Sequence, residues 1–115
     1  MNVRDTLKKN SDFRRLYNKG KSAATPYLVV YCRPNRLERN RLGYTVSTKL
    51  GHAVTRNRVR RRLREIVRLN APSVRPGFDL VIVARSRAVD AAYKKLERAY
   101  LNACARLGLL REDKP

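Results

Sequence analysis

The chain has few of the residues that build metal centres, disulfides or membrane spans. Its 115 residues include no tryptophan, one methionine, one histidine, two cysteines and nine acidic residues. So few ligands exclude a typical zinc site, and no serine, cysteine or carboxylate cluster resembles a nucleophilic centre. No apolar stretch approaches the ~20 residues of a spanning helix, and the polar first ten residues lack the apolar segment of a secretion signal. We therefore expect a cytoplasmic protein without membrane contacts, not catalytic by itself.

Positive charge is what the chain has in excess. Lysine and arginine number 28 against 9 acidic residues, a formal net charge of +19. Such a charge repels itself in a compact state, and nucleic acid is the commonest polyanion that offsets it, because binding releases condensed counterions. With 43% hydrophobic residues, the chain is long enough for one folded domain, residues 1–115. Cys32 and Cys104 lie in apolar patterns and are expected to be reduced core thiols.

Apolar periodicity predicts three helices and three strands in the order α-β-β-α-β-α, an α+β sandwich. Residues 27–33 and 41–47 alternate like strands and are predicted to form a hairpin. Asn10 or Ser11 is expected to cap the first helix, and Gly20 to end it in the left-handed conformation. The last helix is predicted over residues 89–107, with Asp90 as its cap and Gly108 after its end. The remaining predicted elements are a basic helix between Gly51 and about Asn70 and a strand over Phe78–Ala84, an apolar run typical of a doubly covered strand.

The basic helix carries the functional prediction. Seven arginines occupy positions 56–68 with only Glu65 among them. A solvated helix face normally alternates the two signs of charge, whereas like charges at i and i+4 destabilise a free helix. A phosphate partner would offset that repulsion, and arginine makes paired hydrogen bonds to phosphate. Asn57 suits either a base edge or a packing role. The aliphatic positions that share one helix face and should pack on the sheet are Val59, Leu63, Ile66 and Val67.

Several blocks of this sequence resemble the protein subunit of bacterial ribonuclease P. The first is Arg56-Asn57-Arg58 followed by further arginines, which matches the family's RNR motif. The others, in the same order and spacing as in the family, are Leu7-Lys8-Lys9-Asn10, Asp12-Phe13, the stretch from Gly43 to Lys49, Ala53-Val54 and the stretch from Asp79 to Arg85.

The resemblance implies both a fold and a function. The fold is an αβββαβα two-layer sandwich, ribosomal S5 domain 2-like, with an extra strand near residues 21–24 and a left-handed βαβ crossover around the basic helix. The function is that of a ribonucleoprotein subunit: it binds ribonuclease P RNA and precursor tRNA, while the RNA and its Mg²⁺ ions hydrolyse the phosphodiester that joins the 5′ leader. The free protein is expected to be a monomer.

The resemblance also assigns residues to two sites. A leader-binding cleft would be lined by Phe13, Tyr17 and Tyr31, on which bases stack with little sequence preference. Without the resemblance, the first two would be expected to be core contacts of the first helix. The RNA-binding residues would be Lys49, Arg56, Asn57, Arg58, Arg60, Arg61, Arg62, Arg64 and Arg68.

Other functions share the same charge. A ribosomal protein or RNA chaperone without a catalytic complex is the main alternative, distinguished by having no need for an aromatic path for single strands. A DNA-binding protein is disfavoured because no helix-turn-helix pair, dimer seam or wedge pattern is present. A membrane-active helix is disfavoured because residues 54–68 have a narrow aliphatic face without tryptophan or phenylalanine.

Overall fold

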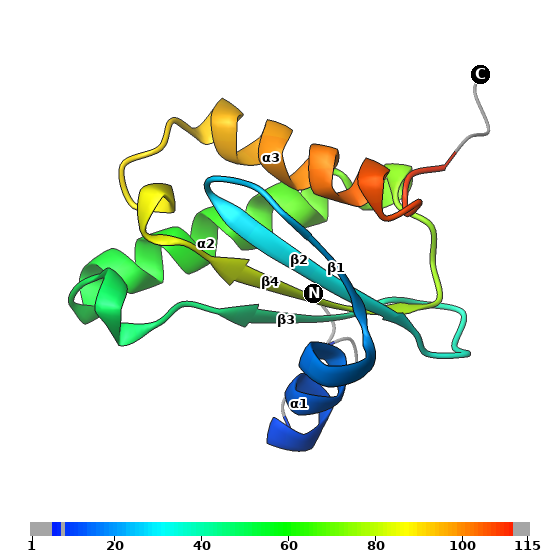
Figure 1. Ribbon diagram of the computed structural model, residues 1–115. Coiled ribbons are helices and arrows are strands. Elements are labelled where there is room, and N and C mark those ends of the chain that lie inside the picture. The colour runs from blue at the N-terminus through cyan, green and yellow to red at the C-terminus, as the bar shows by residue number, and fades with distance from the viewer. Residues whose placement is uncertain (1–5, 8, 112–115) are drawn as a thin grey trace.

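The computed structural model of the chain describes residues 6–7 and 9–111. Two helices cover one face of a four-stranded sheet, and a third helix lies on the other face (Figure 1). The elements follow the order αβββαβα that the family resemblance implied, with one strand more than the periodicity predicted. They are α1 (Asn10–Lys19), β1 (Lys21–Ala24), β2 (Leu28–Pro34), β3 (Arg41–Thr45), α2 (Ala53–Leu69), β4 (Phe78–Ala84) and α3 (Tyr93–Arg106), with short 3-10 turns η2 (Thr48–Leu50), η3 (Ala71–Ser73) and η4 (Ser86–Ala88).

The strand order is β1-β2-β4-β3, and this order contradicts the predicted hairpin. β4 lies between β2 and β3, antiparallel to the first and parallel to the second. β4 is the most apolar strand, and a central position in the sheet buries it most completely. Neighbouring strands cover both its edges there, and helices cover both its faces. The hydrogen-bonded partner of β2 on its other side is β1, the extra strand that the resemblance predicted. α2 makes the crossover between the parallel neighbours β3 and β4.

The main core lies between the sheet and the two helices α2 and α3. From β2 it takes the alternate residues Leu28, Val30 and Cys32, each no more than 4% exposed. From α2 it takes Val59, Leu63, Ile66 and Val67, the face that the helical periodicity predicted. The second cysteine, Cys104, is buried in the same core, and both cysteines are free.

Both ends of α1 differ from their prediction. The helix begins at Asn10 with Lys9 as its cap, and neither polar side chain caps it. Gly20 has φ −83° and ψ 168°, an extended rather than left-handed backbone. A methyl group on Gly20 would lie 2.6 Å from the Leu16 carbonyl oxygen and 2.8 Å from that of Cys32. Glycine is therefore needed here for a close approach of two backbones and not for a positive φ.

The last helix begins later than the periodicity predicted. α3 starts at Tyr93, capped by Ala92 rather than by Asp90. The segment before it is held by α2: the Arg58 and Arg62 guanidinium groups donate to the carbonyls of Val89 and Ala91 at 3.4 and 3.1 Å. These two carbonyls accept hydrogen bonds from arginine side chains, and the helix begins only after them. At the other end Gly108 has φ +72°, the left-handed conformation that was predicted for it.

None of the helices in the described part of the chain is long and apolar enough to cross a bilayer.

Candidate nucleic-acid interface

α2 lies on the sheet by its aliphatic face and directs its arginines to three other sides. Val59 and Ile66 are fully buried and Leu63 is 1% exposed, so this face anchors the helix. The rest of the helix carries seven arginines against Glu65 alone, so its outward surface is strongly electropositive. We call the surface formed by these seven arginines, all within residues 56–68, the arginine surface.

One flank of α2 faces the start of α3. Besides donating to the Ala91 carbonyl, the Arg62 guanidinium lies over the Tyr93 ring, 5.9 Å from the centroid. Arg58 reaches the Val89 carbonyl from one turn earlier in the helix. These two arginines therefore hold α3 and α2 together with part of their hydrogen-bonding capacity, a structural role that the sequence did not reveal.

The opposite flank of α2 faces the edge strand β3. The Arg64 guanidinium lies 5.9 Å from the centroid of the Tyr44 ring. Burial raises the pKa of the Tyr44 phenol, and the positive charge of Arg64 lowers it in part. The Arg56 Nε donates to the Gly51 carbonyl at 3.1 Å, and Arg60 donates to the Asn57 Oδ1 at 3.0 Å. Each contact orients a guanidinium along the helix surface and leaves further N–H donors for a phosphate.

The outward side of α2 carries two arginines that make no hydrogen bond or ion pair with the described residues. Arg61 and Arg68 are exposed, as is Lys49 in the η2 turn before the helix. Val54, at the start of α2, is 83% exposed and places an aliphatic side chain at the end of the arginine surface, which was not predicted.

Three aromatic residues from α1 and β2 meet on the other face of the sheet. Tyr17 and Tyr31 pack edge to face with ring centroids 4.9 Å apart, and Phe13 lies 6.5 Å from Tyr17. Tyr17 is 38% exposed, and the other two rings are partly buried against Leu7, Leu16 and Val81. The structure thus brings together all three residues of the predicted leader site; we call them the aromatic cluster.

Neighbouring strands shape the aromatic cluster. Gly43 of β3 lies beneath Phe13, and a methyl group there would lie 2.7 Å from the ring Cζ. The Tyr17 hydroxyl hydrogen-bonds the Thr45 hydroxyl at 2.8 Å, which holds the ring against β3. Thr45 was not predicted to be at this site, because nothing in the sequence shows which strand α1 crosses.

One carboxylate on the face of the sheet that carries the aromatic cluster is neutralised by an arginine. Asp79 lies on the same face of β4, two residues before Val81. Its carboxylate accepts hydrogen bonds from Arg41 at 2.8 and 2.7 Å and from Asn35 at 3.0 Å. The hydrogen bond to Asp79 raises the pKa of Arg41. At this position of the face the structure therefore presents a paired carboxylate and not an isolated negative charge.

Edge strand β3 lies between the arginine surface and the aromatic cluster. Tyr44 points to the helix layer, where Arg64 covers it, while the next residue, Thr45, points to the aromatic cluster. Successive residues of a strand face opposite sides of a sheet. The arginine surface and the aromatic cluster are consequently separated by one strand, and Lys49 follows that strand at its end.

Across residues 6–7 and 9–111, no three histidine, cysteine, aspartate or glutamate side chains gather as metal ligands do. Asp79, on the same face of the sheet as the aromatic cluster, is paired with Arg41.

Comparisons with known proteins agree on one family. The family model Ribonuclease P matches residues 1–108. The ribonuclease P protein component of Natranaerobius thermophilus is 44% identical over 94% of both chains, and that of Clostridioides difficile is 46% identical over 87% of this chain and 89% of its own. Among solved structures, the Staphylococcus aureus RNase P protein superposes with a TM-score of 0.84 at 32% identity, covering 93% of this chain and 98% of that one. The Thermotoga maritima protein gives 0.78 at 33% identity, covering 84% and 92%. The chain belongs to the ribonuclease P protein family.

Proposed function

We propose that this chain is the protein component of a ribonuclease P ribonucleoprotein, which removes the 5′ leader from precursor tRNA. The observation that carries the proposal is the aromatic cluster: three rings from two elements lie side by side, and the outermost, Tyr17, is 38% exposed. A domain that only coats folded RNA has no need of exposed stacking rings, whereas a protein that holds single strands does.

The arginine surface of α2 is proposed to bind the RNA subunit of ribonuclease P. Its unpaired donors suit the crowded phosphates of a folded RNA, because each guanidinium can bind a phosphate oxygen pair. We assign this role to Lys49, Arg56, Asn57, Arg60, Arg61, Arg64 and Arg68, with Arg58 and Arg62 contributing the donors that α3 does not use. Much of this binding is expected to weaken with salt, as counterion release requires.

The aromatic cluster is proposed to hold the single-stranded leader. Bases stack on aromatic rings with about 1–3 kcal/mol each and little sequence preference. Tyr17 contributes an exposed ring whose position is restricted by the Thr45 hydroxyl. A restricted ring loses less conformational entropy when a base stacks on it. This arrangement suits a protein that processes many different leaders.

Hydrolysis is proposed to belong to the RNA subunit and its Mg²⁺ ions. The described side chains do not assemble a ligand set for such an ion, whereas RNA supplies phosphate oxygens, which Mg²⁺ prefers. The contribution of this chain is then to bind RNA, to neutralise its charge and to position the leader.

A cleavage assay tests the proposal. A bacterial ribonuclease P RNA is incubated with precursor tRNA at low Mg²⁺, with and without the full chain. We expect correct 5′ maturation only when the protein is present. RNA binding without any gain in cleavage would contradict the proposal and favour a ribosomal protein or RNA chaperone.

A further inference from the structure

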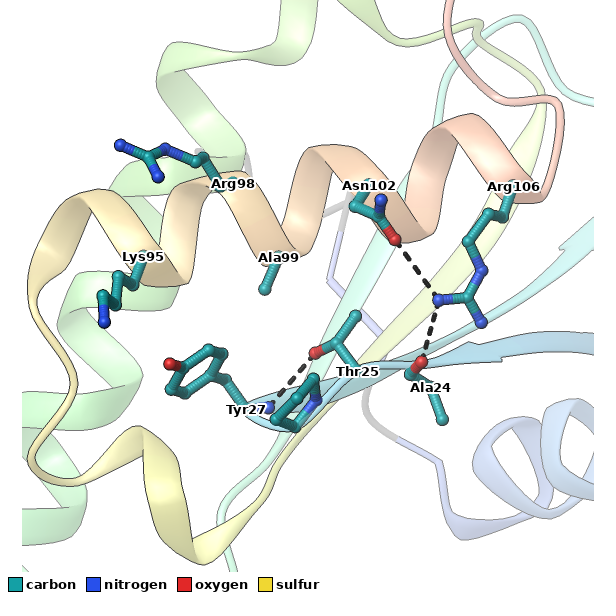
Figure 2. A pocket seen from close by; sticks show the side chains of 9 residues that line it. Ala24, Thr25, Tyr27, Lys95, Arg98, Ala99, Asn102 and Arg106 are labelled. Carbon is teal, nitrogen blue, oxygen red and sulfur yellow. Dashed lines mark hydrogen bonds between the residues drawn. The ribbon is translucent and has the colours of Figure 1, made fainter.

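A hollow lined by aromatic, amide and cationic side chains lies at the sheet edge farthest from the arginine surface. It has a volume of about 440 Å³ and lies between α3 and the turn that joins β1 to β2 (Figure 2). β1 is the edge strand opposite β3. This hollow is therefore separate from both the arginine surface of α2, beside β3, and the aromatic cluster, on the α1 side of the sheet.

The turn that forms one wall is rigid. Thr25 is only 7% exposed, and its hydroxyl donates to the Leu28 carbonyl at 2.8 Å while accepting from the amides of Tyr27 and Leu28. From outside the turn, Arg85 donates to the Thr25 carbonyl at 3.0 Å and Arg106 to the Ala24 carbonyl at 2.9 Å. The wall is thus held in place before any ligand arrives, which reduces the cost of binding.

Tyr27 separates this hollow from a neighbouring one. Both hollows are lined by Tyr27 and Lys95, but only the neighbour is lined by Arg87. The Arg87 guanidinium lies over the Tyr27 ring, 5.9 Å from its centroid. A cation on one side of an aromatic ring leaves the other side available for a planar group.

The remaining walls combine an apolar centre with cations near both ends. Ala99 projects from α3 toward the turn, where Pro26 and the Thr25 methyl group lie, and Lys95 extends beside Tyr27 (Figure 2). At the other end Arg106 donates to the Asn102 Oδ1 at 3.2 Å, which orients the Asn102 amide N–H groups away from that bond. Within the described residues the Lys95 ammonium makes no hydrogen bond or ion pair. Figure 2 shows the Arg98 guanidinium directed away from the hollow.

We propose that this hollow binds one unpaired nucleotide of single-stranded RNA, with its base against Tyr27 and Ala99 and its phosphates near Lys95 and Arg106. The volume lies in the range of small-ligand sites. An aromatic side, an amide and flanking cations are the groups that RNA-binding proteins use for unstacked bases. The proposal extends the RNA contacts of the proposed function to a second edge of the molecule.

Photocrosslinking tests the site directly. The full chain is mixed with a short single-stranded RNA containing 4-thiouridine, irradiated and analysed by peptide mass spectrometry. We expect fragmentation of the crosslinked peptides to locate one crosslink at Tyr27, in addition to crosslinks at residues of the aromatic cluster. The absence of a Tyr27 crosslink, when the cluster does crosslink, would overturn the proposal.

Binding of the same RNA to paired variants gives an independent readout. Tyr27→Leu should weaken affinity about 5-fold or more, as the loss of one stack implies, whereas Tyr27→Phe should keep it. Lys95→Glu should lower the slope of log affinity against log salt by about 0.7, as for one lost phosphate contact. Lys94→Glu makes the same charge change on the adjacent, exposed residue outside the hollow. Equal effects of the two lysine variants would show a general charge effect and overturn the site.

These outcomes are separable from the proposed function. A chain that crosslinks through Tyr27 but does not activate ribonuclease P RNA contradicts the ribonuclease P role alone. A chain that activates the RNA without contacts at Tyr27 contradicts the nucleotide site alone.

Discussion

The two faces of the sheet are closed to different degrees. On one face α2 and α3 bury a continuous core in which Leu28, Val30 and Ile82 are fully inaccessible. On the other face the short helix α1 covers a smaller cluster, and the exposed Tyr17 lies at its border. The same strands supply both faces, so the difference comes from the helices that cover them.

This difference separates stability from binding. A closed face raises the free energy of unfolding, because it removes apolar side chains from water. A half-covered face gains less, but it leaves aromatic rings where a partner can reach them. The closed face is expected to control unfolding, while the partly open face controls interactions with RNA. Five substitutions or conditions test this division, from the largest expected effect to the smallest.

Leu63→Ala should disrupt the closed face. The side chain is 1% exposed within the main core, and such truncations cost about 2–5 kcal/mol because a cavity remains. Urea denaturation measures the loss. Leu69→Ala is the matched control, since this leucine on the same helix is 53% exposed and should change stability by less than about 0.5 kcal/mol. Equal losses would show that the closed face does not dominate stability.

Gly43→Ala should disturb the partly open face. The added methyl group would lie 2.7 Å from the Phe13 ring, so that ring must move away from the sheet. Overpacking of this kind costs about 1–3 kcal/mol. Combining the change with Phe13→Leu should recover part of the loss in urea denaturation, because leucine is shorter than phenylalanine. Strictly additive losses would contradict the contact.

Tyr17→Ala should weaken leader binding without unfolding the chain. Loss of one stacking ring corresponds to about 1–3 kcal/mol of binding free energy. Affinity for precursor tRNA should fall, while affinity for tRNA lacking a leader stays the same. Tyr17→Phe keeps the ring and removes the hydrogen bond to Thr45, so most binding should remain. Asn18→Ala, an exposed neighbour, serves as control. Equal loss for both RNAs would place the leader elsewhere.

High pH should lower the free energy of unfolding through a thiol buried in the closed face. Burial raises the pKa of the Cys104 thiol from 9.0 to about 11. Between these values the unfolded thiol releases its proton and the folded one keeps it, so stability falls as pH rises. The fall approaches about 1.4 kcal/mol per pH unit for this group. Urea denaturation of the reduced chain from pH 8 to 10.5 should show a smaller decline in Cys104→Ala. An unchanged decline would assign it to other groups.

Two neighbouring arginines of α2 should affect different properties, one the stability of the chain and the other its RNA binding. Arg62→Ala removes the contacts to Ala91 and Tyr93 and should cost about 0.5–1.5 kcal/mol of stability. Arg61→Ala should leave stability unchanged and lower the salt slope of RNA binding by about 0.7–0.9. Urea denaturation and RNA titrations at several salt concentrations measure the two effects. Identical results for both variants would contradict the structural role of Arg62.

Much of the fold was predictable from local patterns. A nearly continuous apolar run located the strand Phe78–Ala84 at its observed bounds, and the helical period located the buried face of α2 residue by residue. The pairing of strands was not predictable in this way, and the expected hairpin between β2 and β3 was wrong. Their neighbour β4 comes more than thirty residues after β3, and periodicity within a segment carries no information about its partner. The extra strand β1 is too short for its period to be recognised and came only from the family resemblance.

The candidate sites divide in the same way. The excess of arginine, its position on one helix and the aliphatic stripe that anchors that helix were all determined by the sequence, because charge and helical period are local properties. Only the tertiary structure decided that Arg58 and Arg62 hold α3, that Thr45 restrains Tyr17, and that Tyr27 meets α3 across a hollow. Each of these pairs joins residues far apart in the chain, so their contact depends on sheet order and helix packing.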